Sequence, residues 1–232
     1  MSAPSAVHRI VLPATAALLL GACSFGEPTL QETREMELTV APGSALAIQA
    51  GAGPMTVAGH DGDSILVEAR IYQRSANDDY RLLLETDGND GARLVAETGS
   101  GSFGTSDYID LAIRVPRTMQ LRIEDGSGSL CVRDLDGDLD IEDGSGSITI
   151  ASIGGNVVVE DGSGSISIEG VGGDLRIDDG SGSIEASQVA GTVSISDGSG
   201  SITVRDAGDF ELREDGSGSV TLEGIRSRGE SD

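Results

Sequence analysis

The sequence predicts an all-β protein, a single-chain β-solenoid with 18-residue coils that is preceded by a less regular β cap and a signal peptide. Three observations predict this fold. The pentapeptide Asp-Gly-Ser-Gly-Ser occurs six times at a constant spacing of 18 residues. The apolar residues between the copies keep fixed positions. Glycine is abundant, with 34 residues, and lacks the period of three that is typical of collagen.

The first segment, residues 1–22, has the pattern of a secretory signal peptide. Arg9 precedes an apolar stretch, Ile10 to Leu20, that is too short to span a bilayer as a helix. The stretch ends in Leu-Gly-Ala-Cys, where an aliphatic and two small residues precede Cys23. This motif resembles the bacterial lipobox, which implies that Cys23 is acylated, becomes the mature N-terminus and anchors the chain in a lipid bilayer.

Residues 23–37 follow the lipobox and are mostly polar, so we expect a tether between the lipid and the folded domain. The lipobox implies a location in the cell envelope. Ser24 directly follows the cysteine, and a serine there favours the outer membrane, on its periplasmic or surface side, over retention in the inner membrane.

Residues 38–120 are less regular, and we expect them to form a β cap on the N-terminal end of the solenoid. The segment 50–57 resembles the start of a repeat, and Ile65 with Val67 resembles its second strand. Alternating apolar patterns at 80–84, 92–96 and 109–115 also predict strands.

Residues 121–226 contain the six regular repeats, and a polar tail, 227–232, follows them. With the aspartate as coil position 0, aliphatic residues fall at positions 5, 7, 10, 14 and 16. Pairs spaced by two predict strands with one face inward, and small residues at positions 11 and 12 predict a turn between them. The handedness of the solenoid is left open. A left-handed hexapeptide helix also has 18 residues per coil, but one hexad in three, residues 183–188, departs from its pattern.

The lipobox, Val115-Pro116-Arg117 before the array and the Gly-Ser-Gly-Ser-Ile repeats together resemble the bacterial DUF4097 family and the related head-GIN family. The DUF4097 family is described as candidate adhesins. The resemblance covers about residues 38–225 and implies an envelope β-solenoid without catalytic residues.

The charge of the chain limits its partners. The 39 acidic residues against 15 basic ones give a formal net charge of −24. A surface this acidic repels nucleic acid, so we expect no nucleic-acid partner, and it attracts cations. The ligand, in the envelope or outside the cell, is not identified by the sequence.

The repeated aspartates are the candidate metal ligands, because stacked coils align their carboxylates and calcium prefers oxygen ligands. The alternative is that each aspartate accepts hydrogen bonds from the following turn amides. No other cofactor is expected. The six aspartates are Asp125, Asp143, Asp161, Asp179, Asp197 and Asp215.

No pattern in the sequence predicts catalysis. After processing, His60 is the one histidine left, which is too few for a Ser-His-Asp or zinc site. Cys131, at coil position 6, is expected to point outward. We therefore expect a non-enzymatic, adhesin-like scaffold or binding module. The alternatives are a calcium-stabilised solenoid and, more distantly, a polysaccharide-active enzyme.

Overall fold

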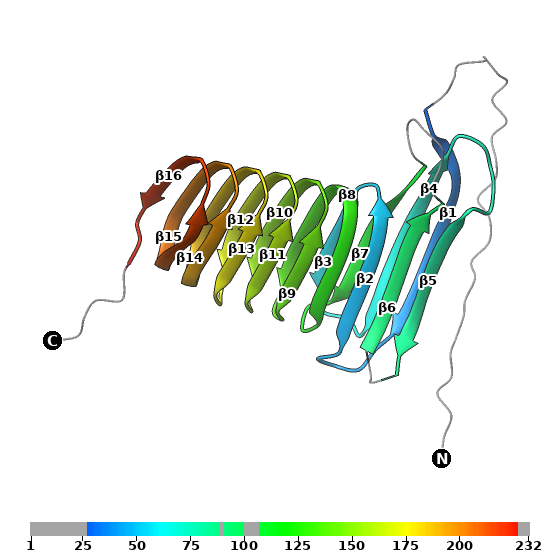
Figure 1. The fold of residues 1–232 in the computed structure, drawn as a ribbon. Coiled ribbons are helices and arrows are strands. Elements are labelled where there is room, and N and C mark those ends of the chain that lie inside the picture. The colour runs from blue at the N-terminus through cyan, green and yellow to red at the C-terminus, as the bar shows by residue number, and fades with distance from the viewer. Residues whose placement is uncertain (1–26, 89–90, 100–106, 227–232) are drawn as a thin grey trace.

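The computed structural model describes residues 27–88, 91–99 and 107–226. The secondary-structure elements in these residues are all β-strands. Figure 1 shows a rod of stacked coils that continues at one end into a wider set of strands, β1 to β7. The expected all-β solenoid is confirmed.

Each regular coil contains a longer and a shorter strand. In the second repeat these are β10 (Gly146–Ile153) and β11 (Val157–Asp161). Corresponding strands of successive coils pair in parallel, with Ile148 opposite Ile166 and Val157 opposite Leu175. The register advances by 18 residues per coil, as the spacing of the repeats predicts. The other strands of the array are β8 (Gln120–Leu135), β9 (Leu139–Asp143), β12 (Gly164–Val171), β13 (Leu175–Asp179), β14 (Gly182–Asp197), β15 (Gly200–Asp215) and β16 (Gly218–Glu223).

The longer strand turns a corner at coil position 9, where the backbone has a positive φ. Asp134, Ser152, Gly170 and Gln188 occupy this position in successive coils, with φ between 56° and 77°. The resulting coil has one eight-residue and one five-residue strand in β10 and β11, so it does not divide into three equal hexads.

The core is one continuous column of aliphatic side chains. The residues at coil positions 5, 7, 10, 14 and 16 point inward, and in the second coil all five are at most 2% exposed. They belong to a single hydrophobic cluster that also contains the core residues of β2 to β7. The predicted strand phase is therefore confirmed.

The coil that contains β15 departs from the pattern by one residue. Phe210 and Leu212 lie opposite Val193 and Ile195, but the register then shifts so that Glu214 faces Ser196. Arg213 is the extra residue, which is the signature of a β-bulge. The bulge explains how the last repeat keeps its register although its aliphatic residues come one position early.

The longer strands of the coils stack on one side of the rod and the shorter strands on the other, and we call these two sides its sheets. The N-terminal part extends both. Its strands are β1 (Thr29–Thr39), β2 (Ala45–Ala52), β3 (Met55–His60), β4 (Ser64–Gln73), β5 (Tyr80–Asp87), β6 (Gly91–Thr98) and β7 (Tyr108–Pro116). β2 and β3 both stack in parallel on β8. Beyond β3, the sheet continues through β7, β4 and β1, and beyond β2 it continues through β6 and β5.

Two expectations about this part need correction. The predicted tether, residues 23–37, includes most of β1, which pairs antiparallel with β4. The Tyr80 hydroxyl donates a 2.8 Å hydrogen bond to Glu32, so this polar strand is attached to the fold through its side chains as well. Ile65 and Val67 lie on β4, which pairs antiparallel with β1 and β7, rather than forming the second strand of a coil. By contrast, residues 50–57 do align with a repeat start, since Ala50 faces Asp125 and Met55 faces Leu130.

Candidate functional site: carboxylate rows and a hydroxyl face

The repeated aspartates form a buried row at one edge of the solenoid. Asp143, Asp161 and Asp179 end the shorter strands β9, β11 and β13. The aspartates face each other in register, Asp143 beside Asp161 and Asp161 beside Asp179. Asp125, Asp143, Asp161, Asp179 and Asp197 are only 3–7% exposed. We call these five side chains the aspartate ladder. The backbone of Asp215 continues the register beside Asp197, but its side chain lies outside the described part of the structure.

One oxygen of most ladder aspartates is used to form the turn. The amides of Ser145, Ser163, Ser181 and Ser199 donate to the Oδ1 atoms of the aspartates two residues earlier, at 3.1–3.3 Å. This is the turn arrangement that the sequence offered as the alternative to a metal site. It does not account for the second carboxylate oxygen.

Burial raises the pKa values of four ladder aspartates. Desolvation, with the charge of Asp143 as the next cause, raises the pKa of Asp125 to about 7. Desolvation also raises the pKa of Asp179 to about 6, with the Ser181 amide opposing the shift and Asp161 and Asp197 adding to it. The pKa values of Asp143 and Asp161 are raised by the same burial.

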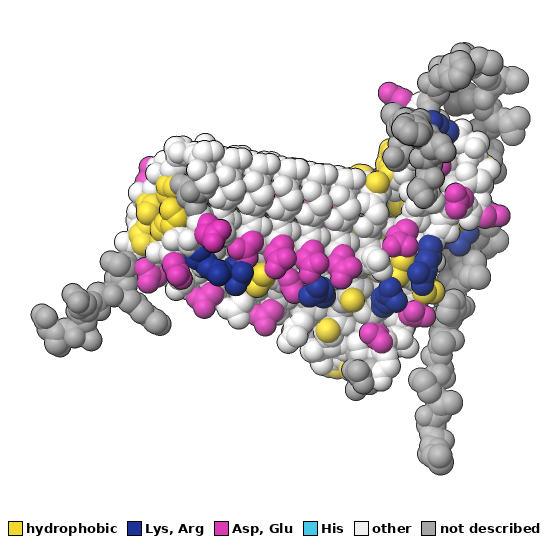
Figure 2. All heavy atoms as spheres, in the orientation of Figure 1, with side chains coloured by type: hydrophobic (Ala, Val, Ile, Leu, Met, Phe, Trp, Pro, Cys, Tyr) yellow, Lys and Arg dark blue, Asp and Glu magenta, His cyan; other side chains and the backbone are white. Residues whose placement is uncertain are grey.

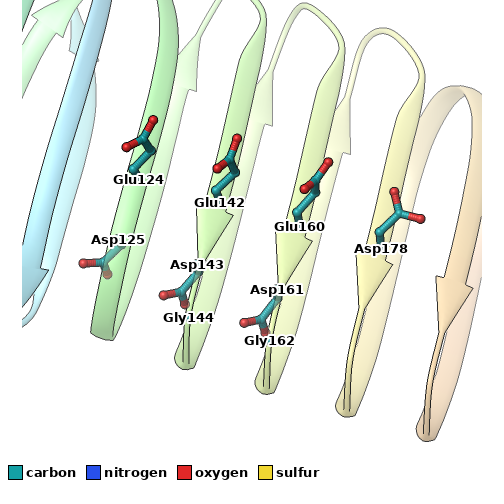
Figure 3. A pocket seen from close by; sticks show the side chains of 9 residues that line it. All are labelled: Glu124, Asp125, Glu142, Asp143, Gly144, Glu160, Asp161, Gly162 and Asp178. Atoms are coloured by element: carbon teal, nitrogen blue, oxygen red, sulfur yellow. The ribbon is translucent and has the colours of Figure 1, made fainter.

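A second row of acids lies one residue earlier and faces solvent. Glu124, Glu142, Glu160 and Asp178 line an open groove together with the first three ladder aspartates (Figure 3). In Figure 2 acidic side chains form a band along the rod, interrupted by arginines. Arg122 forms ion pairs with Glu124, Asp140 and Glu142, and Arg176 pairs with Asp178 at 2.6 Å. These exposed pairs offset part of the repulsion within the outer row.

Within the described residues, no group of three or more His, Cys, Asp or Glu side chains is arranged to hold a metal ion. The aspartates predicted as calcium ligands are thus brought together as a linear stack, with neighbours only above and below. Calcium takes six to eight oxygen ligands, and the stack presents few to any one point.

The opposite sheet carries rows of hydroxyl groups. Coil positions 4 and 6 of the longer strands point outward in register, Ser147 beside Ser165 and Thr149 beside Ser167. Apart from Cys131 and Glu185, all of these side chains are serine or threonine, and nearly all are exposed. We call this surface the hydroxyl face. Its members are Ser129, Ser147, Thr149, Ser165, Ser167, Ser183, Ser201, Thr203, Ser219 and Thr221.

The structure also places the two other residues that the sequence singles out, Cys131 and His60. Cys131 is half-buried on the outward phase between Leu130 and Val132, which are 1% and 0% exposed, so its predicted outward direction is confirmed. His60 stabilises the turn between β3 and β4. The Gly62 amide donates to Nδ1 at 3.0 Å, so Nε2 carries the proton and donates to the Ser64 carbonyl at 2.8 Å.

Sequence reasoning missed a ladder at coil position 13. The Asn156 amide donates to the Asp138 carboxylate, and the Asp174 amide donates to the Asn156 side chain, at 2.7 and 2.9 Å. The Thr192 amide continues the series to Asp174 at 2.8 Å. The signal was a polar side chain with an oxygen acceptor at the same position in three coils.

Cys23 lies outside the described residues, and its acylation stays a prediction. In the part of the chain that the structure describes, no helix is long and apolar enough to cross a membrane.

No family model and no curated protein matches the chain. Among solved structures, it is similar to a candidate cell adhesion protein from Clostridium sporogenes, with 12% identity, a TM-score of 0.45 and coverage of 83% of this chain and 99% of that one. A candidate adhesin from Bacteroides fragilis has 13% identity, a TM-score of 0.45 and coverage of 83% and 97%.

Proposed function

We propose that this protein is a non-enzymatic, lipid-anchored scaffold of the cell envelope, located at the outer membrane, that binds an uncharged ligand through the hydroxyl face in an adhesin-like manner. The observation that carries the proposal is the hydroxyl face itself. The same two outward positions recur over successive coils, and their one carboxylate, Glu185, forms an ion pair with Arg205, which also pairs with Glu223.

The hydroxyl face is suited to recognise a repetitive polymer. Hydroxyl groups donate and accept hydrogen bonds, and those on paired strands are held in fixed places. Successive rows are separated by the strand spacing of about 4.8 Å, and positions 4 and 6 by about 6.8 Å along each strand. A flat, ordered array of this kind gains affinity from many weak contacts rather than from one deep pocket.

The binding role is tested by placing a bulky charge on the hydroxyl face. Ser167→Arg should reduce retention of the purified protein on isolated cell envelopes, because the guanidinium blocks neighbouring rows. Ser194→Arg, on the other sheet, is the matched control and should bind as the wild type does. Equal retention of both variants and the wild type would contradict the assignment of this face.

The lipid anchor is tested separately through Cys23. We expect Cys23→Ala to accumulate as an unprocessed precursor whose intact mass contains no fatty acid. The wild-type protein should carry acyl chains and sediment with membranes. Secretion of the wild-type protein free of lipid would contradict the anchor but leave the binding face untouched.

A further inference from the structure

The aspartate ladder contains carboxylate oxygens with no visible partner. Oδ2 of Asp143, Asp161 and Asp179 is buried and accepts no hydrogen bond. Both Oδ atoms of Asp125 are buried too, and the Gly126 and Ser127 amides make only weak contacts with them, which lower its pKa less than burial raises it. Buried polar atoms in folded proteins nearly always have partners. Four carboxyl groups in register, each with at least one buried oxygen that lacks a partner, therefore require an explanation that the turn amides do not provide.

Full ionisation of the ladder would be costly. Paired strands place neighbouring carboxyl groups about 4.8 Å apart, and each group is removed from water. An ionised carboxylate in such a place lacks solvation, and like charges beside it disfavour ionisation further. Burial raises the pKa of Asp125, Asp143, Asp161 and Asp179, and the charge of a neighbouring aspartate adds to the shift at Asp125, Asp143 and Asp179.

The surrounding charges do not neutralise the ladder. The titratable groups that line the groove beside it are its own members and the outer row, Glu124, Glu142, Glu160 and Asp178, all of which are negative when ionised. The arginines beside the outer row, Arg122 and Arg176, form their ion pairs with the outer row and with Asp140. Within the described residues, the charge that affects Asp125 and Asp143 comes from the next aspartate of the ladder.

We propose that the aspartate ladder holds protons in the folded rod, and that their loss on alkalinisation loosens the coil stack. Each proton comes from solvent; in Asp143, Asp161 and Asp179 it binds Oδ2, while Oδ1 continues to accept from the turn amide. The neutral carboxyl group gains an O–H donor that can face the carboxyl oxygen of the next coil. The protein thus has a pH-sensitive element that is independent of its proposed binding function.

The direction of the pH effect follows from the pKa values. The folded-state pKa values, about 7 for Asp125 and about 6 for Asp179, exceed the ordinary value of 3.8 that applies to the unfolded chain. Between these limits the folded state binds more protons than the unfolded state. The free energy of unfolding therefore falls as the pH rises from about 4 to about 7.

The test compares thermal unfolding of the full chain at about pH 5 and about pH 8, in wild type and in Asp161→Asn. Asparagine imitates a protonated carboxyl group, since its oxygen still accepts from the Ser163 amide and its nitrogen donates. We expect the wild type to melt at a lower temperature at the higher pH. The variant should melt above the wild type at about pH 8 and lose part of the pH dependence. Glu160→Gln, one residue away on the outer row, should leave the pH dependence unchanged.

A second measurement keeps the proposal testable if the asparagine variant folds poorly. The infrared carbonyl band of protonated carboxyl groups should be present in the folded wild type near neutral pH and vanish on unfolding. The absence of this band, or a wild type whose melting temperature rises with pH, would overturn the proposal. So would a lower melting temperature in EDTA that millimolar calcium restores, because that result would assign the neutralising charge to a bound cation.

Discussion

At the scale of single residues, the glycines at coil position 3 determine how closely coils stack. Gly164 has a φ of 149°, and a Cβ there would overlap the carbonyl oxygen of Gly146 in the coil below. Gly170, at position 9, also has a positive φ, but its nearest contact for a Cβ is 3.5 Å away, and the neighbouring coils have Ser152 and Gln188 there. The close approach of the coils therefore requires glycine at position 3, whereas position 9 also accepts residues with side chains.

We therefore expect Gly164→Ala to lower the free energy of unfolding by about 3 kcal/mol or more, because the backbone of two coils must separate. Gly170→Ser should change it by about 0.5 kcal/mol or less, since the same corner accepts a serine one coil earlier. Urea unfolding of both variants measures the difference. Similar losses at the two positions would mean that φ, and not the approach of the coils, limits position 3.

Cys131 gives a second prediction at this scale. Its side chain lies on the hydroxyl face, where neighbouring coils have Thr56 and Thr149. We expect the native thiol to react with a maleimide, more slowly than an exposed thiol because the side chain is half-buried. Cys131→Thr should be nearly neutral for stability. A thiol that labels only after denaturation would contradict the outward direction.

At the scale of a coil, the same substitution has different effects along the rod. Val159 on β11 is completely buried, with coils on both sides, whereas Leu222 on β16 is 44% exposed. An aspartate at Val159 would be an unpaired charge in the core, and we expect it to cost about 4 kcal/mol or more. Leu222→Asp should cost about 1 kcal/mol because its side chain is already half in water. Equal losses in chemical denaturation would argue against a stacked, nearest-neighbour core.

The difference between the regular coils and the cap explains what the sequence could predict. The regular coils repeat one local pattern, so inward residues such as Ile148 and Val159 follow from the period alone. In the cap, β1 and β4 pair antiparallel across 25 or more residues, and nothing in their local sequence specifies that partner. The polar composition of residues 29–37 resembles a linker because an edge strand with two wet faces needs few apolar residues.

The sequence predicts how the aspartates of the candidate site are aligned, but not how deeply they are buried. The register of the ladder, Asp143 beside Asp161, follows from the constant spacing. How completely the carboxyl groups are removed from water depends on the tight Gly-Ser-Gly turn, which a linear pattern does not specify. The alternation places Glu160 outward and Asp161 inward on the same strand, and only the structure shows how completely the aspartates are buried.

At the scale of the whole molecule, the two ends of the rod are unequal. The N-terminal end is covered, since β2 and β3 stack on β8 and are followed by β6, β5, β7, β4 and β1. At the other end, β16 pairs only with β15 in the described structure, and Leu212, Val220 and Leu222 are 36–44% exposed. Figure 2 shows this as an apolar patch at the end of the rod.

In a stacked rod each coil is stabilised by its neighbours, so local stability should decrease toward the uncovered end. We expect hydrogen exchange of backbone amides to be slowest from β8 to β14, to remain slow in β2 and β3, and to accelerate through β15 and β16. Mass spectrometry of peptides along the chain would measure this profile. If β16 exchanged as slowly as β11, the end of the rod would have to be covered in solution, and if β2 exchanged as fast as β16, the strands beyond it would not act as a cap.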